Sequence, residues 1–95
     1  MTPPETQNPI TDLPDGKKKI DFSARPVLID GVEVSSIVMR EPTVGDQLAV
    51  DGIKSAAQKE VAILANLCEL APENISGLKM REYGLLQDAY QAFMI

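Results

Sequence analysis

A chain of 95 residues allows one domain, and its nine Lys plus Arg against fourteen Asp plus Glu give a net charge of −5. This acidic balance argues against nucleic acid or an anionic membrane as the main partner. No histidine accompanies the single cysteine, Cys68, so the chain has no internal disulfide, no pair of ligands for a zinc site and no imidazole for catalysis. We expect no cofactor, no metal, no nucleic acid partner and no membrane span.

Residues 1–23 hold four of the seven prolines among polar residues. Such a composition buries too little apolar surface to offset chain entropy. We therefore predict a disordered tail over residues 1–23 and a single small α+β domain over residues 24–95. The three lysines at 17–19 favour a solvated tail over a phosphate contact, because lysines in a flexible polar segment are usually just hydrated.

The stretch "PVLIDGVEVSSIVMR" predicts a β-hairpin with strands at about 26–29 and 32–40. The Asp30–Gly31 pair between the two apolar runs is the turn signal, because both turn positions favour positive φ. The apolar alternation slips by one residue near the Ser35–Ser36 pair, which predicts a bulge. A lone hairpin is unstable in water, so it must pack on helices or on a strand of a neighbouring subunit.

The stretch "REPTVGD" predicts a structural junction between hairpin and helices. Pro42 blocks continuation of the strand, and Thr43 is a plausible N-cap with Asp46 three residues on, for a short helix to about residue 50. Gly45 would allow close approach by the hairpin or by a neighbouring chain. Arg40 would pair with Asp46 or with a partner's carboxylate, and the intramolecular pair is the simpler expectation.

A second helix is predicted to begin after Ser55 and to run to about residue 70, apolar over most of its circumference. Leu64 and Cys68 lie on one face, and Leu67 and Leu70 on another. Such a helix lies at the centre of a core or between subunits. Because one small domain would hardly cover both faces, we expect a homo-oligomer or association with another chain.

A single helical turn should follow from Pro72 to Gly77, and a last helix over about 79–94. The fold prediction is therefore α+β: an N-terminal β-hairpin followed by three to four α-helices packed on it. The last helix carries an apolar stripe, which either packs on the hairpin and middle helix or docks a partner. From these apolar faces we predict the partner-binding residues Leu67, Leu70, Tyr83, Leu86, Tyr90 and Phe93.

The sequence contains no combination of residues that is typical of a catalytic site. The serines and Cys68 have no imidazole to activate them. The carboxylate pairs Asp46/Asp51 and Glu69/Glu73 have spacings typical of ordinary surface patterning. We expect a protein that is not an enzyme.

The motifs "REPTVGDQLAVDG" and "KEVAILANLCELAPENISGLKMREYGLLQDAYQAF", in this order, resemble the tail assembly chaperones of Mu-like and P2-like contractile-tailed phages. The resemblance covers about residues 26–95 and implies a non-enzymatic role. The residues that carry it are Arg40, Pro42, Thr43, Gly45, Asp46, Leu67, Leu70, Pro72, Glu73, Ile75, Leu78, Arg81, Tyr83, Leu86, Gln87 and Phe93.

Members of that family are thought to bind and solubilise the tape measure protein until tail tube subunits displace them. The resemblance thus implies a chaperone of virion morphogenesis, encoded by a phage or prophage. It would act in the host bacterial cytoplasm and be absent from the mature virion. The ending "AFMI" fits the short product of a frameshifted pair, whose longer product would contact the tail tube protein. Two alternatives remain: a minor structural tail protein of the virion, and a nucleic-acid-binding regulator that would use the lysines at 17–19.

Overall fold

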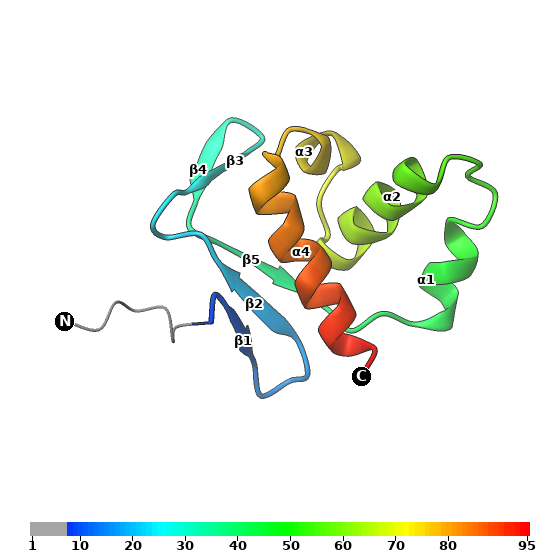
Figure 1. The fold of residues 1–95 in the computed structure, drawn as a ribbon, viewed down its shortest axis with the longest axis horizontal. Helices are drawn as coiled ribbons and strands as arrows, with labels where there is room; N and C mark the ends of the chain where they lie inside the picture. Colours follow the sequence, from blue (N-terminus) through cyan, green and yellow to red (C-terminus); the bar gives the residue numbers. More distant parts are fainter. Residues whose placement is uncertain (1–7) are drawn as a thin grey trace.

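The computed structural model describes residues 8–95, and within them it confirms the predicted α+β class (Figure 1). Strands β1, β2 and β5 form an antiparallel sheet in the order β1-β2-β5, and β3 and β4 form a separate hairpin. The strands are β1 (Ile10–Asp12), β2 (Lys18–Asp21), β3 (Val27–Ile29), β4 (Val32–Val34) and β5 (Ser36–Met39). The helices are α1 (Val44–Ala49), α2 (Ala56–Cys68), α3 (Pro72–Ser76) and α4 (Met80–Phe93).

The predicted disordered tail is wrong where the structure describes it, because β1 and β2 lie within residues 10–21. Residues 1–7 of that predicted tail lie outside the described residues. The segment is poor in apolar residues, yet Ile20 is fully buried and Phe22, two positions on, is only 5% exposed. Since alternate residues of a strand share one face, these two side chains reach the same core while β1 and β5 supply the backbone partners.

The β3–β4 hairpin is confirmed, with Asp30 at φ 54° and Gly31 at φ 80° in its two-residue turn. The single strand predicted over 32–40 is wrong, and so is the bulge. The chain instead leaves the hairpin after Val34 and enters the three-stranded sheet at Ser36, where β5 pairs with β2. The slip in apolar alternation therefore marks a change of sheet, because each sheet requires its own residues to face the core.

The predicted helix starts are confirmed. Thr43 and Ser55 cap α1 and α2, each accepting a hydrogen bond from the backbone N–H three residues on. The chain turns out of α2 at Glu69, which has a left-handed backbone at φ 57°, and Pro72 then opens α3 at its first turn. These caps fix the directions of three successive helices.

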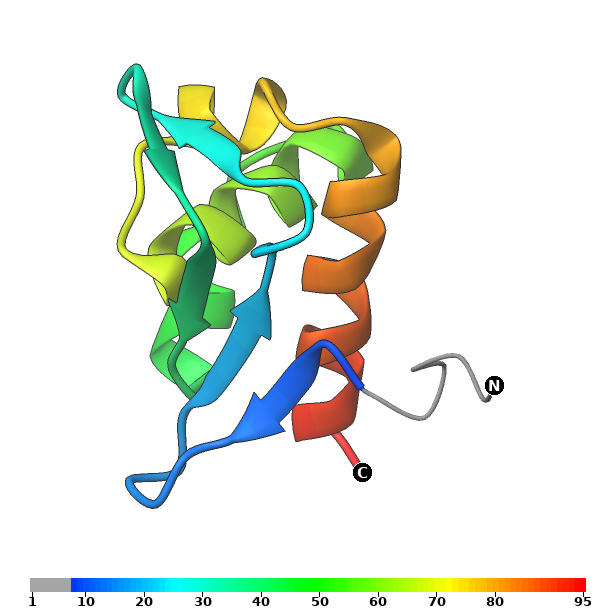
Figure 2. The ribbon, with the colours of Figure 1, turned by 90° about the vertical axis from the view of Figure 1, so that its left-hand side faces the viewer.

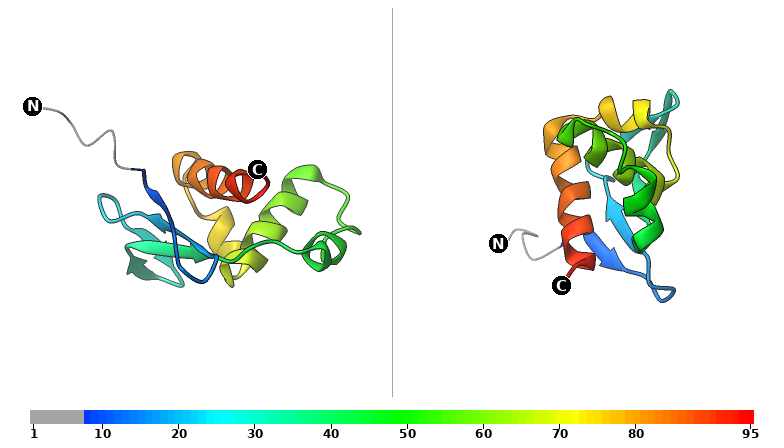
Figure 3. Two further views of the ribbon diagram at one scale, coloured as in Figure 1. Left: turned by 90° about the horizontal axis from the view of Figure 1, so that it is seen from below. Right: turned by 90° about the vertical axis from the view of Figure 1, so that its right-hand side faces the viewer.

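One face of the three-stranded sheet is covered by helices, with α2 beside β5 and α4 beside β2 (Figures 2 and 3). Ile20, Ile37 and Met39 point into the core, whereas Lys19, Asp21 and Val38 on the other face are exposed. Helix α1 lies at the far end of the molecule from the β3–β4 hairpin (Figure 1).

Both faces of α2 are largely buried within one subunit. Leu64 and Cys68 of one face and Ile63 and Leu67 of the other are all at most 8% exposed. The expectation that one domain could not cover both faces is therefore wrong, because α1, α3, α4 and β5 all pack against α2. Any association with other chains must rest on residues that the fold leaves uncovered.

Candidate partner-binding surfaces

The predicted junction between hairpin and helices is built around an ion pair. Arg40 donates from Nη1 to Asp46 Oδ2 at 2.8 Å and from Nη2 to Asp46 Oδ1 at 2.7 Å, which confirms the predicted intramolecular pair. The Thr43 N–H donates to Asp46 Oδ2 at 2.8 Å, and the Asp46 N–H donates to Thr43 Oγ1 at 3.2 Å. This reciprocal capping box ties the start of α1 to the end of β5.

The electrostatics of the junction follow from these bonds. The hydrogen bonds from Arg40, and after them those from Thr43, hold the pKa of the Asp46 carboxyl far below its usual range. The same contact with Asp46 raises the pKa of Arg40. Both groups therefore stay charged at neutral pH, and a bidentate pair fixes orientation as well as distance. The ion pair positions α1.

The other two junction residues have simpler roles. Pro42 lies between the end of β5 and the cap of α1, where a strand cannot continue. A Cβ added at Gly45 would meet only Thr43 Oγ1, at 3.6 Å, so no part of the described chain approaches closely there. The expected approach by the hairpin is wrong, and an approach by a neighbouring chain stays a prediction.

Two of the six predicted partner-binding residues lie in the core. Leu67 is 1% exposed and Leu86 is fully buried, at the contact of α2 and α4 with the sheet. The folded subunit gives a partner no access to either side chain. The apolar stripe of α4 thus packs on the protein's own core over much of its length, which is one of the two alternatives that the sequence left open.

Tyr83 takes part in a polar cluster between α2 and α4. Its hydroxyl donates to Glu60 Oε1 at 2.6 Å, and Gln87 Nε2 donates to the same oxygen at 2.9 Å. Burial, and then the bond to Glu60, raise the pKa of Tyr83 well above its usual range. The cluster holds the Glu60 carboxylate against α4, so the negative charge of this residue is fixed beside the neighbouring surface.

Tyr90 lies beside a cavity bounded by α1, α2 and α4, which we name the α1–α2–α4 cavity. Its volume is about 270 Å³, and its lining includes Val50, Ile63 and Tyr90. The rest of the lining is Gln47, Lys54, Ala56, Lys59 and Glu60. The cavity therefore has an apolar part and a charged rim.

Phe93, at the end of α4, is half-buried and lies against the β1–β2 hairpin. The Nζ of Lys18 lies 4.8 Å from the centre of the Phe93 ring, and the same ammonium group pairs with Asp12. A cation over an aromatic face is a favourable contact. The lysines at 17–19 consequently lie in and beside a strand, not in the flexible tail that the sequence suggested.

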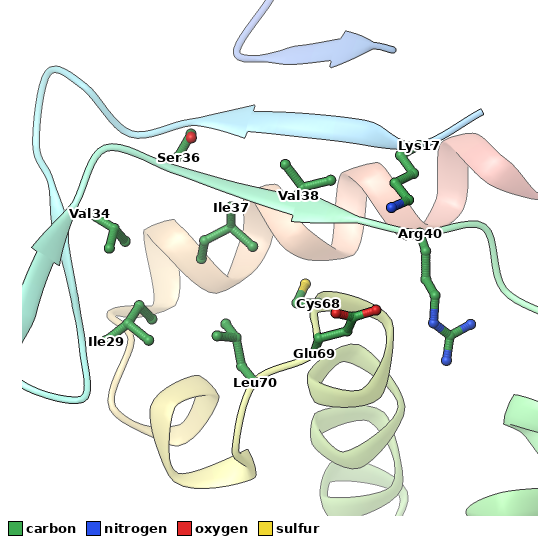
Figure 4. Close-up of a pocket in the computed structure, with 10 residues that line it drawn as sticks. All are labelled: Lys17, Ile29, Val34, Ser36, Ile37, Val38, Arg40, Cys68, Glu69 and Leu70. Carbon is green, nitrogen blue, oxygen red and sulfur yellow. The ribbon is translucent and has the colours of Figure 1, made fainter. Parts of the chain in front are cut away.

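Leu70 lies in a groove along β5, just after the end of α2 (Figure 4). Its volume is about 270 Å³. Ile29, Val34 and Leu70 surround one end, and Lys17, Arg40 and Glu69 the other (Figure 4). Leu70, Tyr90 and Phe93 therefore border three separate hollows, and Tyr83 is joined to the hollow of Tyr90 through Glu60, so the four accessible predicted residues do not converge on one surface.

Two exposed apolar residues of α1 were not predicted from the sequence as partner contacts. Val44 is 78% exposed and Leu48 is 67% exposed on α1, one helical turn apart and opposite the buried Asp46 and Val50. Their i, i+4 spacing is the signal that could have found them. A further hollow between α2 and α3 is lined by Ala57, Gln58, Val61, Ala62, Pro72 and Ser76, none of them charged.

Three further observations concern metal ligands, the cysteine and the helices of residues 8–95. This part of the chain holds no group of three or more His, Cys, Asp or Glu side chains placed to bind a metal ion. Burial raises the pKa of the Cys68 thiol to about 12, so this sulfur is protonated and unreactive at neutral pH. Over the same described range, no helix has the length and apolarity needed to cross a membrane.

A comparison with protein-family models gives one match, over residues 22–95. The matching family is described as "Phage tail assembly chaperone proteins, E, or 41 or 14". The match begins just after β2 and takes in the β3–β4 hairpin, β5 and α1 to α4. Comparisons with curated proteins and with solved structures found no match.

Proposed function

Because the chain belongs to the phage tail assembly chaperone family, we propose that it binds the tape measure protein during tail morphogenesis, keeps it soluble and is displaced by tail tube subunits. The family membership covers more than three quarters of the chain and includes the junction motif and every helix. A tape measure protein is long and helical, so its chaperone needs apolar surface that is open to a partner.

The observation that carries the proposal is the apolar face of α1. Val44 and Leu48 are more than two-thirds exposed, in a helix held rigidly by the Arg40–Asp46 pair. Exposed aliphatic side chains that neighbour each other on a fixed helix favour a docking role over a packing role. A short helix with two such residues supports contacts of low individual affinity, which suit a coat that forms by many contacts and is later removed.

The predicted partner-binding set is narrowed accordingly. We propose Val44, Leu48 and Tyr90 as contacts on the helical side, and keep Leu70, Tyr83 and Phe93 as proposals for partially exposed contacts. Leu67 and Leu86 support the fold that presents these residues.

The remaining expectations follow from the proposed role. We propose that the chain acts in the host bacterial cytoplasm during assembly of a contractile tail and is absent from the mature virion. It would form a homo-oligomer along the tape measure protein, and contact with the tail tube protein would be made mainly by a longer frameshifted product. A role without catalysis agrees with the absence of histidine from the sequence.

Co-expression with the cognate tape measure protein tests the proposal. We expect a soluble complex that can be purified with wild-type chain. Leu48→Asp should reduce recovery of the complex several-fold while the chain stays folded, because the side chain is exposed. Lys19→Glu, on the open face of the sheet, is the matched control and should leave recovery unchanged.

A tape measure protein that stays insoluble beside a folded, abundant wild-type chain would overturn the proposal. Mass spectrometry of purified particles separates it from the alternative of a minor structural tail protein. The proposal expects no peptides of this chain in mature virions, whereas a structural subunit would be present in every particle.

A further inference from the structure

We propose that the α1–α2–α4 cavity binds the apolar edge of a partner helix whose neighbouring residues are acidic. This inference rests on the proposed function and names the chemistry of the partner segment. It concerns a different surface from the outward face of α1 that carries Val44 and Leu48, because Gln47 of that helix and Val50, just after its end, line the cavity instead.

The walls of the cavity favour a helix as the occupant. Most of the lining comes from α1, α2 and α4, whose backbone groups are mostly bonded within each helix, and Val50 and Lys54 come from the connection between α1 and α2. An extended segment would bring unpaired N–H and C=O groups against Val50, Ile63 and Tyr90, and leaving such groups unpaired is unfavourable. A helix satisfies its own backbone and presents only side chains to such a surface.

The size of the cavity also favours a helix side chain over a small molecule as the occupant. At about 270 Å³ it lies just under the range of about 300–1,000 Å³ that is usual for small-molecule sites. Of the apolar lining, Tyr90 is half-buried, whereas Val50 and Ile63 lie beneath it at 2% and 5% exposure, so Tyr90 is the main apolar contact that a partner could reach. The space suits one anchoring aliphatic side chain packed on Tyr90, as in helix-in-groove recognition.

The charged residues at the rim of the cavity predict the charge of the partner segment. Lys54 and Lys59 both line the cavity, and neither has an ion pair within 4 Å in the described part of the chain. Glu60 is the one acidic residue of the lining, and its Oε1 already accepts hydrogen bonds from Tyr83 and Gln87. Two lysines against one glutamate leave the lining with a net positive charge, in a chain whose net charge is −5.

Charge complementarity therefore selects acidic residues on the partner helix, placed beside its apolar stripe so that they meet the two ammonium groups. An exposed charge mainly raises the association rate and sets specificity, while the apolar contact supplies affinity. The same lysines would attract any polyanion, but the apolar lining makes no favourable contact with the phosphates of a nucleic acid backbone.

A peptide scan tests the inference. Overlapping helical peptides that cover the cognate tape measure protein are titrated with the folded full chain, and binding is measured by fluorescence anisotropy. We expect the tightest peptides to carry Asp or Glu beside an aliphatic stripe, and their affinity to fall at least threefold between low and physiological salt. Lys54→Glu/Lys59→Glu should weaken their binding about tenfold or more. Ala56→Trp, which fills the cavity from its exposed rim, should weaken it at any salt concentration.

Lys19→Glu reverses the charge of one side chain on the open face of the sheet and is the control. Circular dichroism checks that each variant is folded. If wild-type chain binds peptides and the cavity variants bind as well as the control, the inference fails while the proposed function stands. If wild-type chain binds neither the peptides nor the intact tape measure protein, the proposed function fails. Tighter binding to duplex DNA than to any peptide would overturn the assignment of the rim to an acidic helix.

Discussion

Arg40 and Asp46 meet through two parallel hydrogen bonds, of 2.8 and 2.7 Å, across the turn between β5 and α1. The Asp46 side chain is 11% exposed and that of Arg40 33% exposed, so the pair is only partly screened by water. The same carboxylate completes the capping box with Thr43. One side chain therefore fixes both the helix start and its direction relative to the sheet.

Removing this carboxylate should destabilise the protein clearly. Asp46→Ala deletes the charged hydrogen bonds, leaves Arg40 without its partner and removes part of the helix cap. We expect a loss of about 2–4 kcal/mol in the free energy of unfolding, measured by urea denaturation. Asp51→Ala, at an exposed position just after α1, is the matched control and should change stability by less than about 0.5 kcal/mol. Equal effects at the two positions would contradict the structural role of the pair.

The lowered pKa of Asp46 predicts a loss of stability in acid. The folded-state pKa is depressed relative to the ordinary value of 3.8, so the unfolded chain takes up the proton first as pH falls. The stabilisation is fully present above about pH 5 and decreases as pH falls through 3.8 and below. The difference in unfolding free energy between wild type and Asp46→Asn should therefore shrink from pH 6 to pH 2.5. A constant difference over this range would show that the carboxylate charge is not involved.

Ile20 tests the position of the N-terminal strands. It is fully buried in β2, so Ile20→Ala should lower the free energy of unfolding by about 2–4 kcal/mol, through lost burial and the cavity left behind. Thr11→Ala, on the exposed part of β1, should have little effect. If residues 8–23 were a disordered tail, both substitutions would be silent in thermal or urea unfolding.

Substitutions at Leu86 and Leu48 distinguish a residue that packs in the core from one that contacts a partner. Leu86→Ala should lower the free energy of unfolding by about 2–5 kcal/mol because the side chain is fully buried in the core. Leu48→Ala should leave stability within about 0.5 kcal/mol of wild type because two-thirds of its surface is exposed. Only the second substitution should reduce recovery of the tape measure complex without lowering the melting temperature.

Cys68 should resist alkylation in the native state. The residue is 8% exposed, and a thiol pKa raised to about 12 leaves almost no thiolate at pH 8. We expect iodoacetamide to label the folded chain at least a hundredfold more slowly than the chain in 6 M guanidinium, followed by mass spectrometry. Comparable rates in the two states would show that the end of α2 opens readily.

The local features of this fold could be predicted from the sequence because short-range signals decide them. The Asp30–Gly31 turn, the Thr43 and Ser55 caps and the Pro72 start each depend on a few neighbouring residues. The Arg40–Asp46 pair follows from the same short range, since the two residues flank one turn. Helix positions were accordingly accurate to within one or two residues.

The sequence by itself determined the helices, the hairpin turn, the junction and the resemblance that names the family. Only the tertiary structure decided that β1 and β2 join β5, that the chain changes sheet at Ser35, and that Leu67 and Leu86 are core while Val44 and Leu48 are surface. The physical reason is the separation along the sequence of the residues that interact. A strand poor in apolar residues becomes stable only when distant segments supply its hydrogen bonds and its cover, and burial of a helical face depends on what packs against it.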